Sequence, residues 1–355
     1  MAHPRIHNAT PFAFSSVFAT DLSGQPLFVP LLKASFRIAP DGSLSVADPQ
    51  APVLLAGAWW GDPETTSLRA EPEAIAPKPG TDVVLMGHAC PQRPGDTDVH
   101  VGLRVGPLSK VARVFGDRHW VRRAGFAVRT EPEPFERVPL RWELAFGGWD
   151  RQAEDPSRHR GELRNPVGRG FWNSWPDGAS RLPLPNIEDP KNLISSFDDR
   201  PQPMGFGFIG MHWAPRVQWG GTCDGAWLTN RMPLPPLDLD PRFWQGVMPD
   251  QVVNPHLLGH EPLVVVGTRP GEALQTRLPG SGQPPVFDVV RRPSGHEQLT
   301  GRLDTVIVDT DSMTLSMLWR AAMPVAHVPA DVAEVHVRWP GGFWADPPLP
   351  SGAQG

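Results

Sequence analysis

Short segments of alternating hydrophobic and polar residues recur along the chain, and they predict β-strands. The clearest covers residues 31–38, where Leu32, Ala34, Phe36 and Ile38 fall on one side of an extended chain and polar residues fall on the other. A period of two residues is typical of a strand with one buried face. The Pro-Asp-Gly at 40–42 then predicts a turn, and residues 44–46 are expected to return as a hairpin partner.

Similar patterns predict further strands in both halves of the chain. Residues 99–105 alternate and follow the continuously apolar residues 83–86, so we expect a four-stranded meander that reaches residue 115. Near the C-terminus, residues 303–308 and 313–320 flank Asp-Thr-Asp-Ser, a loop of hairpin length and composition. Shorter strands are expected at 263–267, 274–278, 286–291 and 335–339.

Signals for helices are few. Asp189-Pro190 and Asp240-Pro241 each place an N-cap residue before a proline at the first helical position, so short helical turns are expected at 191–196 and 242–246. The rest of the region between 150 and 250 is dense in Pro, Gly and Trp and predicts long packed loops.

Together these elements predict a mainly β protein. We expect antiparallel sheets arranged as a sandwich or barrel, with long Pro/Gly/Trp-rich loops and a few short helices. The 44 prolines and 35 glycines are spread between apolar segments, which favours many short strands over long helices. The expected organisation is an N-terminal β-rich lobe at 1–150, a loop-rich middle segment packed on the lobes at 151–250, a C-terminal β-rich lobe at 251–340 and a disordered tail at 341–355.

Composition and charge narrow the range of functions. The 33 Lys and Arg against 38 Asp and Glu give a net charge of -5, which disfavours binding to a nucleic acid backbone. No apolar run approaches the ~20 residues of a membrane helix, and the polar residues 1–10 carry no sign of an export signal. The two cysteines, Cys90 and Cys223, have no metal-type spacing. We therefore expect a cytoplasmic protein that binds neither nucleic acid nor membrane.

Three groups of residues could carry chemistry, and each has a simpler explanation. His256 and His260 stand four apart beside Glu261, but prolines at 255 and 262 leave room for barely one helical turn between them. For His88 and Cys90 the sequence identifies no orienting acid. The acidic pairs are typical of turns; they are Asp198 with Asp199, Asp238 with Asp240, and Asp309 with Asp311. We therefore predict no catalytic centre, no metal site and no cofactor.

An ordered series of short phrases resembles one bacterial family, domain of unknown function 2169. The phrases are TDV and GHA (81–83, 87–89), LRVGPLS (103–109), VFGDR (114–118), PLRWE and AFGG (139–143, 145–148), NPVGRG (165–170), LPN and EDP (184–186, 188–190), GFG and IG (205–207, 209–210), PRF and PDQ (241–243, 249–251), and LDT and LWR (303–305, 318–320). The resemblance covers about residues 8–325. Each phrase is unspecific by itself, and the specificity lies in their number and order.

The resemblance implies a non-catalytic adaptor or chaperone of type VI secretion. Such a protein binds a toxin effector, at its PAAR or N-terminal region, and helps to load it on the spike, with the VgrG spike protein as a further partner. The family pattern supplies no catalytic residues. Eight motif positions are candidates for partner binding, with fixation of turns and buried ion pairs as the alternative role: His88, Phe115, Asp117, Arg141, Glu143, Asn165, Arg169 and Asn186.

Two other functions stay open on the sequence. One is a carbohydrate- or cell-wall-directed hydrolase or lectin, because paired carboxylates cleave glycosides and the 14 tryptophans could stack on sugars. The other is a structural component of the secretion spike. A facing pair of carboxylates in a cleft would favour the hydrolase, and presence in purified secretion particles would favour the spike component.

Overall fold

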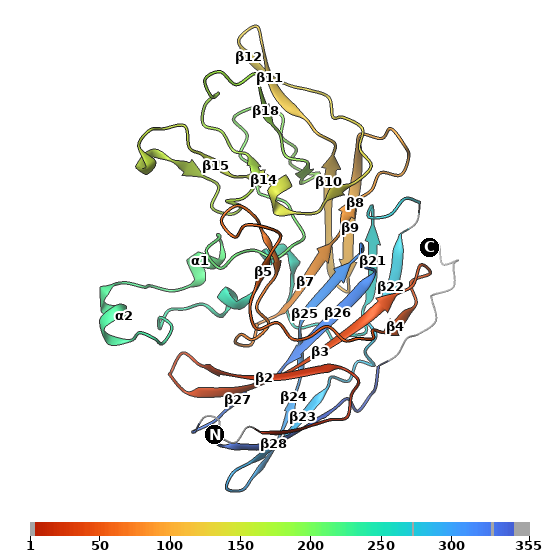
Figure 1. Cartoon of the computed structure of the whole chain (residues 1–355), viewed down its shortest axis with the longest axis vertical. Helices are drawn as coiled ribbons and strands as arrows, with labels where there is room; N and C mark the ends of the chain where they lie inside the picture. The colour runs from red at the N-terminus through yellow and green to blue at the C-terminus, as the bar shows by residue number, and fades with distance from the viewer. Residues whose placement is uncertain (1–3, 272, 328–329, 344–355) are drawn as a thin grey trace.

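Strands dominate the computed structural model, which describes residues 4–271, 273–327 and 330–343. The largest sheet runs through the middle of the elongated molecule (Figure 1). Its order is β2 (Ala13–Thr20), β3 (Pro26–Ile38), β26 (Thr314–Arg320), β25 (Arg302–Asp309), β7 (Thr81–Met86) and β20 (Val252–Val253), while β4 (Leu44–Val46) and β27 (Met323–Pro324) pair with β3. Its strands come from both predicted β-rich lobes, so the lobes are joined through one sheet.

Two further sheets pack with it. The five-stranded sheet has the order β19 (Ile187–Glu188), β10 (Leu108–Phe115), β9 (Asp98–Val105), β21 (Pro262–Val266) and β22 (Leu274–Arg277). The four-stranded sheet has the order β1 (Arg5–Asn8), β28 (Val332–Arg338), β23 (Val286–Arg291) and β24 (His296–Thr300). Buried side chains of all three sheets share one hydrophobic core.

Smaller elements complete the structure. A three-stranded sheet of β12 (Phe126–Arg129), β11 (His119–Arg123) and β18 (Arg181–Pro183) lies at the upper end in Figure 1. The paired short strands are β5 (Ala58–Trp59) with β6 (Leu68–Ala70), β8 (His88–Ala89) with β13 (Val138–Pro139), β14 (Phe146–Gly147) with β17 (Arg169–Gly170), and β15 (Trp149–Asp150) with β16 (Arg160–Gly161). The helices are α1 (Arg216–Trp219), α2 (Gly225–Asn230) and four 3-10 turns at Trp142–Leu144, Pro156–Arg158, Pro241–Trp244 and Pro249–Gln251.

The prediction of a mainly β fold with a few short helices is confirmed. The hairpin across 309–312 is also confirmed, because β25 and β26 pair on either side of this loop. Asp240 caps the 3-10 turn that starts at Pro241, as its spacing predicts. After Asp189, however, the chain forms a hydrogen-bonded turn and no helix, so that prediction is wrong. The predicted disordered tail is wrong at 341–343, where Phe343 packs against Phe12 of the core, and from 344 onward it lies outside the described residues.

The predicted meander is wrong in one pairing. β9 and β10 form the expected hairpin, but β7 lies in the large sheet, where it pairs in parallel with β25.

β3 is more buried than its alternating pattern predicts. Both of its faces are covered, because Glu73 accepts a hydrogen bond from Lys33 and Gln50 bonds the backbone of Ser35 on the side expected to face water.

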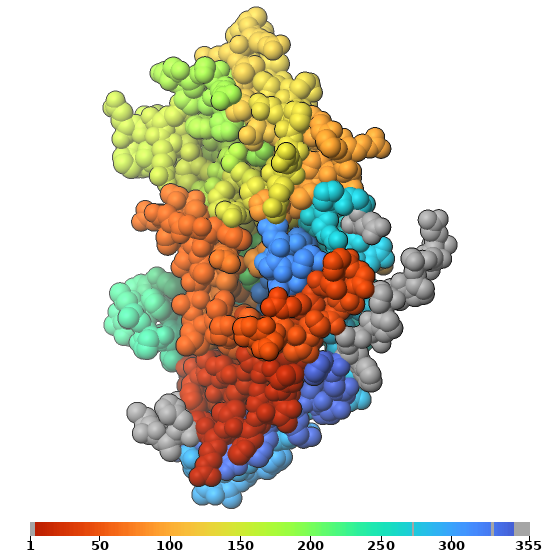
Figure 2. Space-filling view, turned by 45° about the vertical axis from the view of Figure 1, so that its right-hand side comes forward, coloured from red at the N-terminus to blue at the C-terminus, as the bar shows by residue number. Residues whose placement is uncertain are grey.

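The first and the last described strands lie side by side. β1 pairs in parallel with β28, and the N-terminal strands, red in Figure 2, lie against the blue C-terminal strands on the face shown. No helix in the part of the chain that the structure describes is long and apolar enough to cross a membrane.

Candidate functional site

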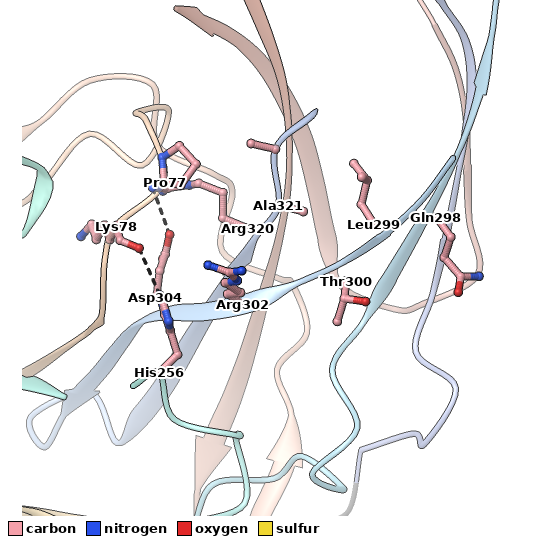
Figure 3. A pocket seen from close by; sticks show the side chains of 11 residues that line it. Pro77, Lys78, His256, Gln298, Leu299, Thr300, Arg302, Asp304, Arg320 and Ala321 are labelled. Atoms are coloured by element: carbon pink, nitrogen blue, oxygen red, sulfur yellow. Dashed lines mark hydrogen bonds and ion pairs between the residues drawn. The ribbon is translucent and has the colours of Figure 1, made fainter. Parts of the chain in front are cut away.

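A groove of about 540 Å³ lies where the four-stranded sheet meets the large sheet (Figure 3). Leu299 and Thr300 of β24 line one side, and Pro77 and His256 line the other. Arg302, at the start of β25, lies between them. The volume falls in the range of about 300–1,000 Å³ that is typical of ligand pockets, so the groove can hold a few side chains but not a folded domain.

The strand beside the groove is a sheet edge. β24 pairs with β23 on one side only, and no other described strand covers its outer side. Alternate backbone N–H and C=O groups of an edge strand point outward and are open to pairing with another chain. The groove therefore combines side-chain pockets with a row of main-chain donors and acceptors.

The two arginines of the groove differ in whether their positive charge is compensated. Arg320 is buried, and its guanidinium lies 3.0 Å from the Asp304 carboxylate and donates to the carbonyls of Ala76 and Glu73. Arg302, its exposed cross-strand neighbour, forms no ion pair with any described residue. The groove therefore carries one uncompensated positive charge at its mouth, which suits a carboxylate ligand.

His256 is part of the groove wall. Its Nε2 lies 3.1 Å from the carbonyl oxygen of Lys78, and burial lowers its pKa below the ordinary value. The neighbouring Glu261 carboxylate accepts hydrogen bonds from the backbone N–H groups of Leu258, Gly259 and His260. The Glu261 carboxylate and the His256 ring thus have separate local partners, whereas the buried Nδ1 of His260 has no hydrogen-bond partner among the described residues.

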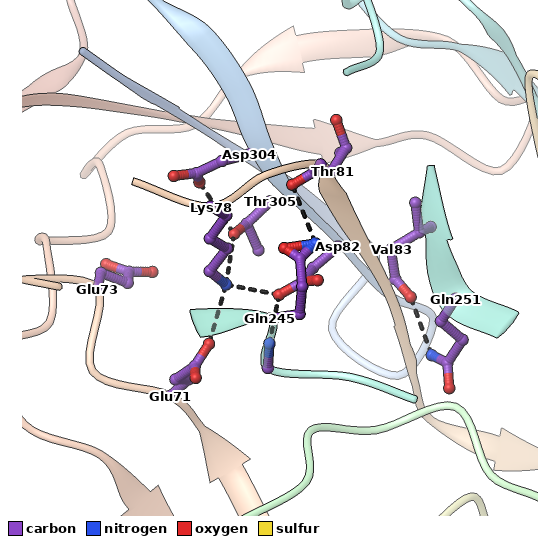
Figure 4. A network of polar contacts seen from close by, with 12 residues as sticks. Glu71, Glu73, Lys78, Thr81, Asp82, Val83, Gln245, Gln251, Asp304 and Thr305 are labelled. Atoms are coloured by element: carbon purple, nitrogen blue, oxygen red, sulfur yellow. Dashed lines mark hydrogen bonds and ion pairs between the residues drawn. The ribbon is translucent and has the colours of Figure 1, made fainter. Parts of the chain in front are cut away.

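A buried network of charges adjoins the groove at Lys78 (Figure 4). The Lys78 ammonium donates to Glu71, to Asp82 and to the hydroxyl of Thr305, at 2.9, 2.6 and 3.2 Å. Arg216 lies 2.8 Å from the other oxygen of Glu71. These charged side chains are at most 3% exposed, so their charges are compensated almost entirely by one another.

Burial and the neighbouring charges shift the pKa values of this network in opposite directions. Burial raises the pKa of Asp82 to about 6, against the opposing effect of Lys78. Burial disfavours the charged form of Lys78 as well, but the Asp82 and Glu71 carboxylates outweigh it and raise the pKa of Lys78 above its ordinary value. Sequence analysis missed this network, although Asp82 beside a continuous apolar run is the one local sign of a buried charge.

Five of the eight motif residues are joined in a separate cluster. The Asn186 amide donates to the carbonyl of Phe115 and to the Asp117 carboxylate, at 3.1 and 3.0 Å. Arg169 donates to the side-chain oxygen of Asn186 and to the carbonyl of Glu143. The cluster thus fastens loops together, with Asp117 exposed and Glu143 and Arg169 half-buried.

Two more motif residues also fix the chain locally. Asn165 is fully buried, and its amide donates to the carbonyls of Trp142 and Phe146, at 2.8 and 3.0 Å. Arg141 lies over the ring of Trp60, with 3.9 Å between the guanidinium carbon and the ring centre. Asn165 therefore has no surface to offer a partner, whereas the half-buried Arg141 has some.

His88 lies apart from the other motif residues. Its Nδ1 is 2.6 Å from the Asp311 carboxylate, which also accepts a hydrogen bond from Arg137 at 2.7 Å. Burial raises the pKa of the nearby Cys90 thiol, which disfavours the nucleophilic thiolate.

The acidic pairs have local roles as well. Asp309 accepts hydrogen bonds from backbone N–H groups of its own turn, and Asp199 does the same in another loop. Asp240 caps a 3-10 turn and pairs with Arg242. Hydrogen bonds from Thr222 lower the pKa of Asp238, the reverse of what a general acid needs.

Comparison with known proteins identifies one family. The model of the family described as "Uncharacterized protein conserved in bacteria (DUF2169)" matches residues 23–320. No curated protein matches the chain, and no solved structure does.

Proposed function

The chain belongs to the DUF2169 family, and from this membership we propose that it is a non-catalytic adaptor or chaperone that works in the cytoplasm and binds a type VI secretion effector. In this role it assists loading of the effector, by its PAAR or N-terminal region, on the PAAR/VgrG spike complex. The proposal extends the resemblance of the motif series, which implies such a role.

The groove beside β24 is the observation that carries the proposal. An extended segment of a partner can add to the free edge of β24 through main-chain hydrogen bonds, while its side chains enter the groove. β24 has five residues, so a partner segment of similar length, about 17 Å when extended, matches it. Such a site recognises a segment that is unfolded or at the end of a chain, which is what a chaperone must hold.

The charge of Arg302 in the groove indicates which type of residue the partner segment carries. Arg302 has no ionic partner among the described residues, and Arg320 beside it is already neutralised by Asp304. A partner carboxylate next to Arg302 would complete the charge balance of the groove. The proposed ligand is therefore an extended segment with an acidic residue.

Co-expression with a type VI secretion effector from the same bacterium tests the adaptor role. We expect a complex that elutes as one species in size-exclusion chromatography. Separate elution, with an effector equally soluble by itself, would contradict the proposal. So would turnover of a polysaccharide by the purified protein alone.

Two single charge-reversal variants, one in the groove and one outside it, test the groove itself. Arg302→Glu should weaken binding by about tenfold or more, because it opposes the acidic segment. The matched control is Arg104→Glu, another exposed strand arginine without an ion pair in the described residues, on β9 of the five-stranded sheet. Complex formation should also slow amide hydrogen exchange at 296–300. If the complex forms and neither effect appears, the adaptor role stands and the groove is the wrong surface.

A further inference from the structure

Two histidines from opposite ends of the chain stack on one face of the four-stranded sheet. His7 on β1 is the direct partner of His336 on β28 in their parallel pairing. The two imidazole rings lie 4.5 Å apart between centres, and their planes differ by 13°. A direct pair on neighbouring strands faces the same side of the sheet, so both rings point to the same region of solvent.

A carboxylate completes the group. Glu334 lies two residues before His336 on β28 and therefore shares its face. Its Oε2 is 3.3 Å from Nε2 of His336 and 3.7 Å from Nε2 of His7. One donor atom from each of the three residues lies within 4.8 Å of the others, and no second group of His, Cys, Asp or Glu in the described part of the chain meets this criterion.

The distances from Oε2 of Glu334 to the two imidazole nitrogens are close to those around a tetrahedral ion, and a turn of one stacked ring lets both nitrogen lone pairs converge on it. Zinc binds imidazole nitrogen at about 2.0–2.1 Å and carboxylate oxygen at about 2.0–2.2 Å, which places neighbouring ligand atoms about 3.4 Å apart. Two imidazoles and a carboxylate are ligands that suit zinc and similar divalent transition metals. We propose that His7, Glu334 and His336 form a surface site for a divalent transition metal of the zinc type, with the remaining coordination position open to water.

The site is accessible, and one cation competes for it. The side chains of His7, Glu334 and His336 are 53%, 32% and 42% exposed, so an ion can enter directly from solvent. Arg5 lies 3.7 Å from the Glu334 carboxylate and is 80% exposed. Because its side chain is free to move away, Arg5 lowers the affinity for the metal without blocking it.

Metal binding would join the ends of the chain. β1 has four residues, all of them exposed, and pairs only with β28 in the described structure. An ion held by His7 from one strand and by Glu334 and His336 from the other links the two strands more firmly than their four-residue pairing alone. The proposed site is thus structural, and it lies outside the groove proposed for the partner.

Calorimetric titration of the full chain with ZnCl₂ tests the site, after chelator treatment and without a polyhistidine tag. We expect one ion per chain. His7→Ala and His336→Ala should each weaken binding by about tenfold or more, while the exposed strand histidine variant His100→Ala and the exposed thiol variant Cys223→Ser should bind as the parent does. Glu334→Gln should weaken binding too, and Arg5→Gln should tighten it by about twofold to fivefold.

The outcomes separate the proposal from adventitious binding. Circular dichroism should show that every variant keeps the parent fold, since all the altered side chains are exposed or half-buried. Zinc should also slow amide exchange at residues 5–8 in the parent and not in His336→Ala. Absence of binding, or binding that is unchanged in both histidine variants, would overturn the site.

Discussion

Arg302 on β25 and Arg320 on β26 are direct cross-strand partners, so two positive charges face each other in one pair. Asp304 and two backbone carbonyls compensate the charge of Arg320. Nothing in the described structure compensates Arg302. Arg302 is therefore open to a carboxylate from a ligand, as proposed above.

Arg302→Gln should therefore stabilise the free protein. Removing one of two opposed like charges is worth about 0.5 kcal/mol in the free energy of unfolding. The gain should shrink at high salt, because salt screens the repulsion. Urea unfolding at low and high ionic strength measures both effects, and a loss of stability at low salt would show that Arg302 has a partner in the folded protein.

The buried network predicts a large effect at Lys78. Lys78→Met leaves Glu71 and Asp82 buried without their shared cation, and should lower the free energy of unfolding by about 3–5 kcal/mol. Lys191→Met is the matched control, because Lys191 is exposed, and it should change stability by less than about 0.5 kcal/mol. Equal losses in the two variants would mean that the network contributes no more than a surface lysine.

A substitution at Asn165 distinguishes a structural role of this motif residue from a partner-binding role. Asn165→Asp replaces an amide that donates to two carbonyls with a carboxylate that cannot donate, and should cost about 3 kcal/mol of stability. The exposed Asn230→Asp is the control and should unfold like the parent. If Asn165→Asp weakens partner binding at unchanged thermal stability, the motif position serves the partner and not the fold.

His256 predicts a dependence of stability on pH. Burial lowers its pKa below the ordinary value of 6.5, so the folded protein binds this proton less readily than the unfolded chain does. The contribution of the neutral ring is therefore present above pH 6.5 and is lost as the pH falls below that value.

His256→Gln tests this dependence, since its amide can also reach the Lys78 carbonyl. Between about pH 7.5 and about pH 5.5 the parent should lose more unfolding free energy than the variant does. Parallel curves for the two proteins would show that His256 does not contribute. The comparison cancels the opposite trend expected from Asp82, which both proteins share.

Local patterns predicted the strands well, but not which strands pair. The alternation at 31–38 and the loop at 309–312 specify β3 and the β25–β26 hairpin, because neighbouring residues contain the information. The parallel pairing of β7 with β25 joins segments more than half the chain apart, and no local pattern encodes it. The helix expected after Asp189 gave way to a turn, in which the Asp189 carboxylate accepts the N–H of Lys191.

The sites were harder to predict than the fold. The motif residues drew attention because they are distinctive in sequence, yet most of them fasten loops, as Asn165 and Asn186 do. The groove depends on Thr300 and Arg302, which have no distinctive local pattern, and on His256, which drew attention only as a possible metal ligand. These residues meet only when two sheets pack. His7 and His336 likewise come together only through the pairing of β1 with β28.

The placement of β1 and β2 beside strands from the end of the chain has a consequence for biosynthesis. β2 and β3 cannot be completed into their sheet until β26 has left the ribosome, and β1 gains its neighbour only with β28. Contacts of such long sequence separation slow folding, since a long loop must close before they form. The N-terminal strands must therefore wait, with apolar faces exposed, until β26 and β28 have been synthesised. This effector chaperone, as we propose it to be, thus passes through a long nascent stage in which it needs protection itself.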